Sequence, residues 1–336
     1  PDQDVLPVKK GDLIGYSGNS GSSGGPHLHF EIRDSSSRPM NPMLFGIEIP
    51  DTKKPIINTI MAYPLSKEAQ VNKSQNPIKL RLILQNDGSY KTEKLEAFGS
   101  IGFGISTYDQ QNGASNKNGV FEIKAINNGE EVFKVHFDKF SFAETRYLNR
   151  FIDYGHYRTN KSRIQKLFRQ SNNPLSIITD KKNNGIITIE DSLSYVYTIE
   201  VKDFKGNLIK VHIPISGMKS EILIPRTDNK TDDFIFADQA TSITKDKFSI
   251  YIPPNSLYEN TYLDIKVTGD TLHLHKDVVP IHKNITITAD ASNYNPSDLD
   301  KLYIGRLNYK GDPYYNSTSK KGSKLTTNTR TFGSYT

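Results

Sequence analysis

The sequence predicts a mainly β protein: a glycine-rich fragment of an antiparallel sheet, followed by two immunoglobulin-like β-sandwich domains. Short runs of apolar and β-branched residues recur along most of the chain, and turn residues separate them at intervals near the ~8–12 residues typical of sandwiches. One stretch, at about residues 140–170, instead has helical spacing. The 336 residues, of which 35% are hydrophobic, suffice for two or three domains with ordinary cores.

The N-terminal segment, residues 1–46, contains two apolar runs, DLIGYS and HLHFEIR, joined by a glycine-serine loop. Both runs are predicted to be strands. Two strands with open edges bury too little apolar surface to offset the entropy lost on ordering. We therefore expect this segment to be the C-terminal part of a larger sheet domain whose N-terminal part lies upstream of residue 1.

The first sandwich is expected over residues 50–217, after the proline-containing boundary IEIPDTKKPIIN. Its last two predicted strands flank FKGN, a good hairpin turn. The helical stretch at about 140–170 would be an insertion within this domain. The expected strands are IKLRLIL (78–84), VFEIKAI (120–126), EVFKVHF (131–137), GIITIE (185–190), YVYTIEVKD and LIKVHIPI.

The second sandwich is expected over residues 218–336, after the polar stretch PRTDNKTDD. The chain stops at TFGSYT, where a strand is under way, so we expect this domain to be cut short at its C-terminus. Its other predicted strands are KFSIYIPP, YLDIKV, NITITAD and KLYIGRLNY.

Composition excludes several classes of site. The chain has no cysteine, so it forms no disulfides, zinc-thiolate sites or cysteine nucleophiles. The net charge of +6 comes from basic residues that are scattered along the chain. This distribution favours a solvated surface of mixed charge over a surface that binds a polyanion such as the cell wall. We expect no nucleic-acid partner. No run approaches the ~20 apolar residues of a transmembrane helix, so no transmembrane segment is expected.

The stretch GGPHLHFEIRD carries the candidate chemistry. In a strand, His27, His29, Glu31 and Arg33 would share one face, while Leu28, Phe30 and Ile32 would face a core. Neutral imidazoles bind zinc, but a catalytic zinc usually needs three protein ligands and an open position for water. Taken alone, the pattern also suits two histidines on a solvated strand face.

The surrounding residues narrow this choice. The string VKKGDLIGYSGNSGSSGGPHLHFEIRD, with NPMLF shortly after it, resembles the C-terminal part of the lysostaphin-type (LytM-like) zinc endopeptidases. The matching elements are the KKGD.IG strand, the GN.G turn, the Ser-Gly loop, GPHLHFE and the following NP. The resemblance implies an enzyme that cleaves peptide bonds in bacterial peptidoglycan, and a location in the cell envelope: periplasmic, outer-membrane-associated or secreted.

The resemblance also implies roles for the two histidines. His29 would be a zinc ligand, and His27 would be the catalytic histidine that polarises the scissile carbonyl or handles the proton of the attacking water. Zinc would lower the pKa of that water toward ~7. Gly25 and Pro26 would shape the bend that aims the strand into the groove.

The motif departs from the family pattern in two ways. The family's other ligands form an HxxxD motif that is expected upstream, and none of the remaining histidines sits in one: His136, His156, His212, His273, His275 and His282. The family commonly has Ser-Thr-Gly-Pro before HxH, whereas Ser23 is followed here by two glycines. We therefore expect this chain alone to be inactive and to hold zinc weakly. The alternative function is a non-catalytic relative that binds the wall or regulates another hydrolase.

The later β domains carry a weaker resemblance to those that follow the peptidase domain in long Bacteroidota members, through AYPLS, GSIGFGISTYDQQNGASNKNGVFEI and ETRYLNRFIDY. These domains would position or anchor the peptidase, and envelope proteins are possible partners for them.

Two further motifs have ordinary structural explanations. TLHLHKD repeats HxH at His273 and His275 but lacks the glycine loop, so a solvent-facing strand is favoured. The oxygen-rich stretch YDQQNGASNKNG (108–119) is suited to calcium, but it contains one carboxylate, Asp109, and fails the EF-hand pattern. A hairpin loop that caps its own backbone is favoured there.

Overall fold

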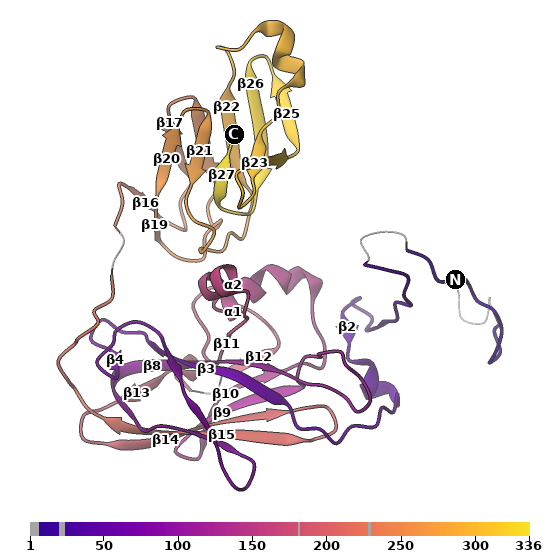
Figure 1. Cartoon of the computed structure of the whole chain (residues 1–336), viewed down its shortest axis with the longest axis vertical. Helices are drawn as coiled ribbons and strands as arrows, with labels where there is room; N and C mark the ends of the chain where they lie inside the picture. The colour runs from indigo at the N-terminus through magenta and orange to yellow at the C-terminus, as the bar shows by residue number, and fades with distance from the viewer. Residues whose placement is uncertain (1–6, 20–23, 181, 228–229) are drawn as a thin grey trace.

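The computed structural model describes residues 7–19, 24–180, 182–227 and 230–336. The fold is mainly β, with several antiparallel sheets and few helices, as the sequence predicts. Two β bodies account for most of the chain, the first over residues 56–217 and the second over residues 233–335. An irregular N-terminal segment lies to one side of the first body (Figure 1).

The N-terminal segment forms less sheet than the sequence predicts. DLIGYS is not a strand, and only the last two residues of HLHFEIR are, as β1 (Ile32–Arg33), which pairs with β2 (Pro39–Met40). Leu28 and Phe30 are 86% and 61% exposed, so the prediction that their side chains face a core is wrong for this chain. The physical reason is that the described residues place no neighbouring strand or layer against this run, and an unpaired extended segment cannot bury its side chains.

The first β body is built on a thirteen-stranded sheet. Its main path runs β12-β10-β9-β14-β15-β8-β3-β5, and all six runs expected from the sequence form strands. The sheet departs from the expected antiparallel pattern where β15 runs parallel to both β7 and β8. The strands are β3 (Ile56–Pro64), β4 (Gln70–Val71), β5 (Ile78–Leu80), β6 (Leu82–Leu84), β7 (Tyr90–Thr92), β8 (Leu95–Tyr108), β9 (Glu122–Asn127), β10 (Glu130–His136), β11 (Gln165–Lys166), β12 (Ile178–Asp180), β13 (Ile187–Ile189), β14 (Ser194–Lys202) and β15 (Leu208–Gly217).

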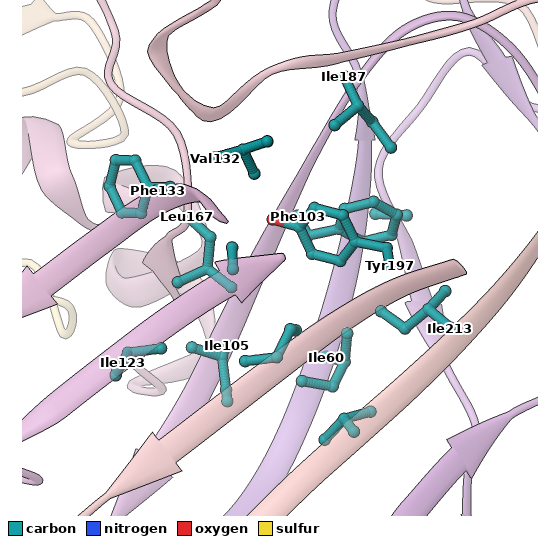
Figure 2. Close-up of a cluster of buried hydrophobic side chains, with 14 of the residues drawn as sticks. Ile60, Phe103, Ile105, Ile123, Val132, Phe133, Leu167, Ile187, Tyr197 and Ile213 are labelled. Carbon is teal, nitrogen blue, oxygen red and sulfur yellow. The ribbon is translucent and has the colours of Figure 1, made fainter. Parts of the chain in front are cut away.

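The core of this body is aromatic and β-branched. Phe103 on β8 and Tyr197 on β14 lie at its centre, with ring centroids 4.3 Å apart, and both side chains are fully buried (Figure 2). Isoleucines from several strands surround the pair, including Ile60 and Ile213 (Figure 2). Alternation along β14 and β15 directs every second residue into this core, which is the period-2 pattern that predicts them from sequence.

The long strand β8 was not among the strands expected from sequence, because its glycines weaken the strand pattern. The structure gives their reason. A Cβ on Gly102 would lie 2.5 Å from the ring of Phe168, and one on Gly104 would lie 2.7 Å from Ile164. These glycines allow the segment after the helices to pack directly on the backbone of β8.

The predicted helical insertion at about 140–170 is confirmed over residues 142–160 but is wrong for residues 161–170, where β11 pairs with β8. It consists of a 3-10 helix η2 (Phe142–Tyr147), α1 (Leu148–Phe151) and α2 (Tyr154–Asn160). Asp153 caps α2 by accepting a hydrogen bond from the His156 amide at 3.0 Å. The helices lie between the two β bodies (Figure 1).

The second β body contains two five-stranded antiparallel sheets, β17-β18-β22-β26-β25 and β20-β21-β27-β23-β24, with a shared core that includes Phe248, Phe332 and Tyr335. A separate pair, β16 with β19, completes it. The final run TFGSYT contributes β27, as expected. The elements are β16 (Asp233–Ile235), β17 (Thr241–Lys245), β18 (Phe248–Ile252), β19 (Thr261–Leu263), β20 (Ile265–Thr268), β21 (Thr271–Leu274), β22 (Ile285–Asp290), β23 (Gly305–Leu307), β24 (Pro313–Tyr315), β25 (Thr318–Lys321), β26 (Lys324–Thr329), β27 (Gly333–Tyr335) and the 3-10 helix η4 (Pro296–Lys301).

Candidate functional site

The candidate site begins at the β1–β2 hairpin, whose turn is organised by Asp34. One oxygen of this carboxylate accepts hydrogen bonds from the amides of Ser36 and Arg38, each at 3.0 Å. The other accepts from the Arg38 side chain at 2.7 Å. An aspartate that bonds its own turn in this way is a common local stabiliser. The hairpin therefore has a defined geometry although it is only two residues deep.

The hairpin is attached to the first β body through its second strand. The Asn41 amide donates to the Asp138 carbonyl at 2.7 Å, and the Phe140 amide donates to the Pro39 carbonyl at 3.0 Å. On the other strand, the Arg33 guanidinium lies 5.2 Å from the centre of the Phe142 ring. The hairpin that follows the two histidines is thus connected by backbone hydrogen bonds to the segment directly after β10.

The Asn-Pro pair after the motif has a structural role. The Asn41 side chain accepts a hydrogen bond from the Met43 amide at 3.1 Å and so caps the 3-10 helix η1 (Pro42–Phe45). Pro42 occupies the first helical position, where its missing N–H costs nothing. This turn fixes the direction in which the chain leaves the hairpin.

His29 and Glu31 lie on the same side of the chain, as the two-residue spacing predicts. The Nε2 atom of His29 is 2.6 Å from one oxygen of Glu31, and Arg33 donates to the other oxygen, also at 2.6 Å. The hydrogen bond with His29, followed by that from Arg33, lowers the pKa of Glu31 below its usual value. Glu31 is therefore ionised near neutral pH, and the Nδ1 atom of His29 is the ring nitrogen left for another ligand.

His27 makes a different contact. Its Nδ1 atom lies 2.9 Å from the Gly25 carbonyl oxygen. Since a carbonyl only accepts, this nitrogen carries the proton. The contact sets the tautomer of His27, and it is made within the GGPH turn where the sequence predicts a bend. Ser23 and the rest of the predicted loop at residues 20–23 lie outside the described residues.

The described residues do not complete a catalytic zinc site around these histidines. A catalytic zinc usually takes three protein ligands. Within the described parts of the chain, the group of three or more candidate ligand side chains whose atoms lie close together is Asp51, Asp109 and Asp203, and neither histidine belongs to it. His29 offers one zinc ligand, and Glu31 is already engaged with His29 and Arg33.

The second HxH pair is built differently. His273 is exposed on β21 and bonds the Ser334 hydroxyl at 2.9 Å, whereas His275 accepts from the Asp264 amide at 3.0 Å. The backbone turns at His275, whose φ is 54°, so the two imidazoles do not share a strand face. The expected solvent-facing strand is confirmed for His273, whereas it is wrong for His275, which follows the end of β21 and is partly buried.

Comparison with known families gives one match that contains the histidine motif and one that contains the second β body. Residues 5–42 match the model of peptidase family M23. This match contains His27, His29, Asn41 and Pro42, and it supports a relation of the N-terminal segment to peptidases. Residues 232–336, which include the whole second β body, match the Zu5-like domain. The first β body lies outside both matches, and no curated protein matches the chain.

No helix within the described ranges has the length and apolar character needed to cross a bilayer. Asp51 and Asp203 are not predicted as candidate ligands, because each is an isolated carboxylate in the sequence. The stretch around Asp109 contains one carboxylate and fails the EF-hand pattern, so the sequence favours a hairpin loop there, whereas the structure brings the three aspartates together.

Proposed function

We propose that this chain carries the C-terminal part of a cell-envelope zinc endopeptidase that hydrolyses peptide bonds of peptidoglycan. The match of residues 5–42 to peptidase family M23 is the observation that carries this proposal. His29 would supply a metal ligand, and His27 would be the catalytic histidine. The two β bodies would act as accessory domains, with boundaries near residues 50–217 and 218–336.

The local contacts support this division of roles. A metal-binding histidine usually gives its second ring nitrogen to a carboxylate, which orients the ring. Glu31 occupies that position at 2.6 Å from His29, and Arg33 holds Glu31 from the other side. The Nδ1 atom of His27 instead contacts the Gly25 backbone carbonyl at 2.9 Å. The proposal requires further zinc ligands from outside residues 1–336.

The test has a sequence step and a biochemical step. The proposal requires an HxxxD motif in the coding sequence that precedes residue 1. A protein extended to include that motif should bind one zinc ion and release muropeptides from purified peptidoglycan. His29→Ala should lose both zinc and activity, and His27→Ala should keep zinc while losing activity.

His273→Ala is the matched control, because it removes a histidine from the other HxH pair and should change neither readout. Absence of an upstream HxxxD motif, or full activity of the His29→Ala protein, would contradict the proposal. The alternative is a non-catalytic wall-binding or regulatory protein. Peptidoglycan binding without muropeptide release by the extended protein would support this alternative.

A further inference from the structure

Three carboxylates from distant parts of the chain meet beside the first β body. Asp51 lies in the linker that follows the β1–β2 hairpin and η1. Asp109 follows the end of β8, and Asp203 is the first residue of the turn between β14 and β15. One oxygen from each lies within 4.8 Å of the other two. Asp109 and Asp203 are only 5% and 2% exposed, so two of the three charges are withdrawn from water.

The Asp109 carboxylate is incompletely satisfied. Its Oδ1 atom is buried and has no hydrogen-bond partner. Burial, together with the charges of Asp203 and Asp51, raises the pKa of Asp109 above its usual value. Buried charges are normally paired or bind metal, and a lone buried carboxylate is costly. Asp109 thus combines a buried oxygen that has no hydrogen-bond partner with two neighbouring carboxylates.

Neutral donors hold the rest of the group in place. The Asn207 amide and side chain donate to the two oxygens of Asp203 at 2.8 and 2.7 Å, and the Lys53 amide donates to Asp51 at 3.1 Å. The Lys53 ammonium instead donates to the Gln111 carbonyl at 3.2 Å. The hydrogen bonds position the carboxylates, and the charge of Lys53 offsets only part of the effects that raise the pKa of Asp109.

We propose that Asp51, Asp109 and Asp203 bind a calcium ion. The set is all oxygen and carries three negative charges, which suits a hard divalent cation and not zinc. Calcium binds oxygen at about 2.3–2.6 Å, so ligands on opposite sides of one ion stand about 4.6–5.2 Å apart. The three oxygens lie within 4.8 Å of one another, which is close enough for one ion to contact all three. A neighbouring cavity of about 270 Å³, lined in part by Asp109 and Asn118, gives room for water ligands.

The position of the site gives the ion a structural role. Asp51 belongs to the linker between the β1–β2 hairpin and β3, while Asp109 and Asp203 directly follow strands of the large sheet. The Asn207 side chain already joins the turn to the Asp51 carbonyl at 3.2 Å. Calcium would strengthen this connection and hold the linker, with the hairpin it carries, against the first β body.

The experiment measures the melting temperature of the full 336-residue chain after EDTA treatment, with and without millimolar CaCl₂, MgCl₂ or ZnCl₂. Calcium should raise the melting temperature by about 5 °C, because it binds only the folded state. It should also slow proteolysis between residues 46 and 56. Asp109→Asn should abolish both effects.

Asp109→Asn should itself melt no lower than the calcium-free parent, since it removes a buried repulsive charge, and this result excludes misfolding as the cause of lost binding. Asp298→Asn is the matched control, because Asp298 is an exposed carboxylate in η4 that pairs with Lys301. It should keep the full calcium response. The proposal is overturned if the parent does not respond to calcium, if zinc alone stabilises it, or if Asp109→Asn retains the response.

Discussion

Arg150 on α1 and Glu259 in the second β body form a two-point ion pair, with nitrogen-to-oxygen distances of 2.9 and 2.7 Å. The Arg150 side chain is 6% exposed and that of Glu259 is 58% exposed. The helical insertion thereby contacts both β bodies. Close by, the Tyr258 hydroxyl donates to the Arg146 carbonyl at 2.7 Å, and the Tyr154 hydroxyl donates to Asp277 at 2.9 Å.

This unequal burial predicts unequal effects of substitution. Glu259→Ala leaves a buried guanidinium without its carboxylate and should lower the free energy of unfolding by about 3 kcal/mol. Arg150→Met leaves a carboxylate that water can reach and should cost about 1 kcal/mol. Urea unfolding measures both. Glu93→Ala, in the exposed Arg81–Glu93 pair, is the control and should cost less than about 0.5 kcal/mol. An equal or larger loss in Arg150→Met would contradict the prediction.

Glu122 on β9 should make stability depend on pH. Burial alone would raise its pKa, but hydrogen bonds from Lys134 and Lys202, together with the charges of Lys134 and Lys124, outweigh burial and lower the pKa to about 2. The folded state thus binds this proton less well than the unfolded state. The resulting stability is present above the unfolded pKa of about 4.5 and is lost as the pH falls toward 2.

Glu122→Gln should therefore be less stable than the parent by about 2 kcal/mol at pH 7. The difference should shrink between pH 4.5 and pH 2, with the folded pKa taken as about 2. Chemical denaturation at a series of pH values gives the measurement. A difference that stays constant over this range would show that Glu122 acts through packing and not through its charge.

Gly102 should tolerate no side chain. A Cβ there would lie 2.5 Å from the Phe168 ring, so Gly102→Ala must displace that ring and should cost about 2 kcal/mol. Gly119→Ala has open space around its Cβ and should change stability by less than about 0.5 kcal/mol. Thermal unfolding of the two variants tests whether Phe168 packs closely on β8. Similar losses of stability in both variants would refute this close contact.

The 336-residue chain should neither hold zinc tightly nor cut peptidoglycan, because its histidine motif offers fewer than three ligands. Metal analysis after dialysis and a zymogram with added zinc make the test. A lysostaphin-type enzyme with a complete ligand set serves as positive control. A clear lytic band from this chain would refute the prediction.

Residues 1–46 should be the first part of the chain that proteases cut. Within residues 24–31, no strand forms and Leu28 and Phe30 are exposed, whereas Met40 and Asn41 pair with the first β body. Early cleavage should therefore fall before β1. Mass spectrometry of a limited digest locates the cuts, and initial cleavage within either β body would count against this order of stability.

Much of the fold is predictable from local patterns. Alternation in YVYTIEVKD and LIKVHIPI predicts β14 and β15, and the change to helical spacing predicts the helices between Phe142 and Asn160. The strand β8 is less accessible to such reasoning, because Gly102 and Gly104 weaken its pattern. Glycine is needed at these two positions because Phe168 and Ile164 pack against the backbone of β8, and this contact exists only in the folded chain.

The candidate sites divide in the same way. The sequence alone determines the spacing of His27 and His29, the glycine turn before them and the resemblance to a peptidase motif, because these features lie within a few consecutive residues. The tertiary structure alone decides that Leu28 remains exposed. It also decides that Asp51, Asp109 and Asp203 meet, since carboxylates far apart in the chain become neighbours only when strands and turns pack together.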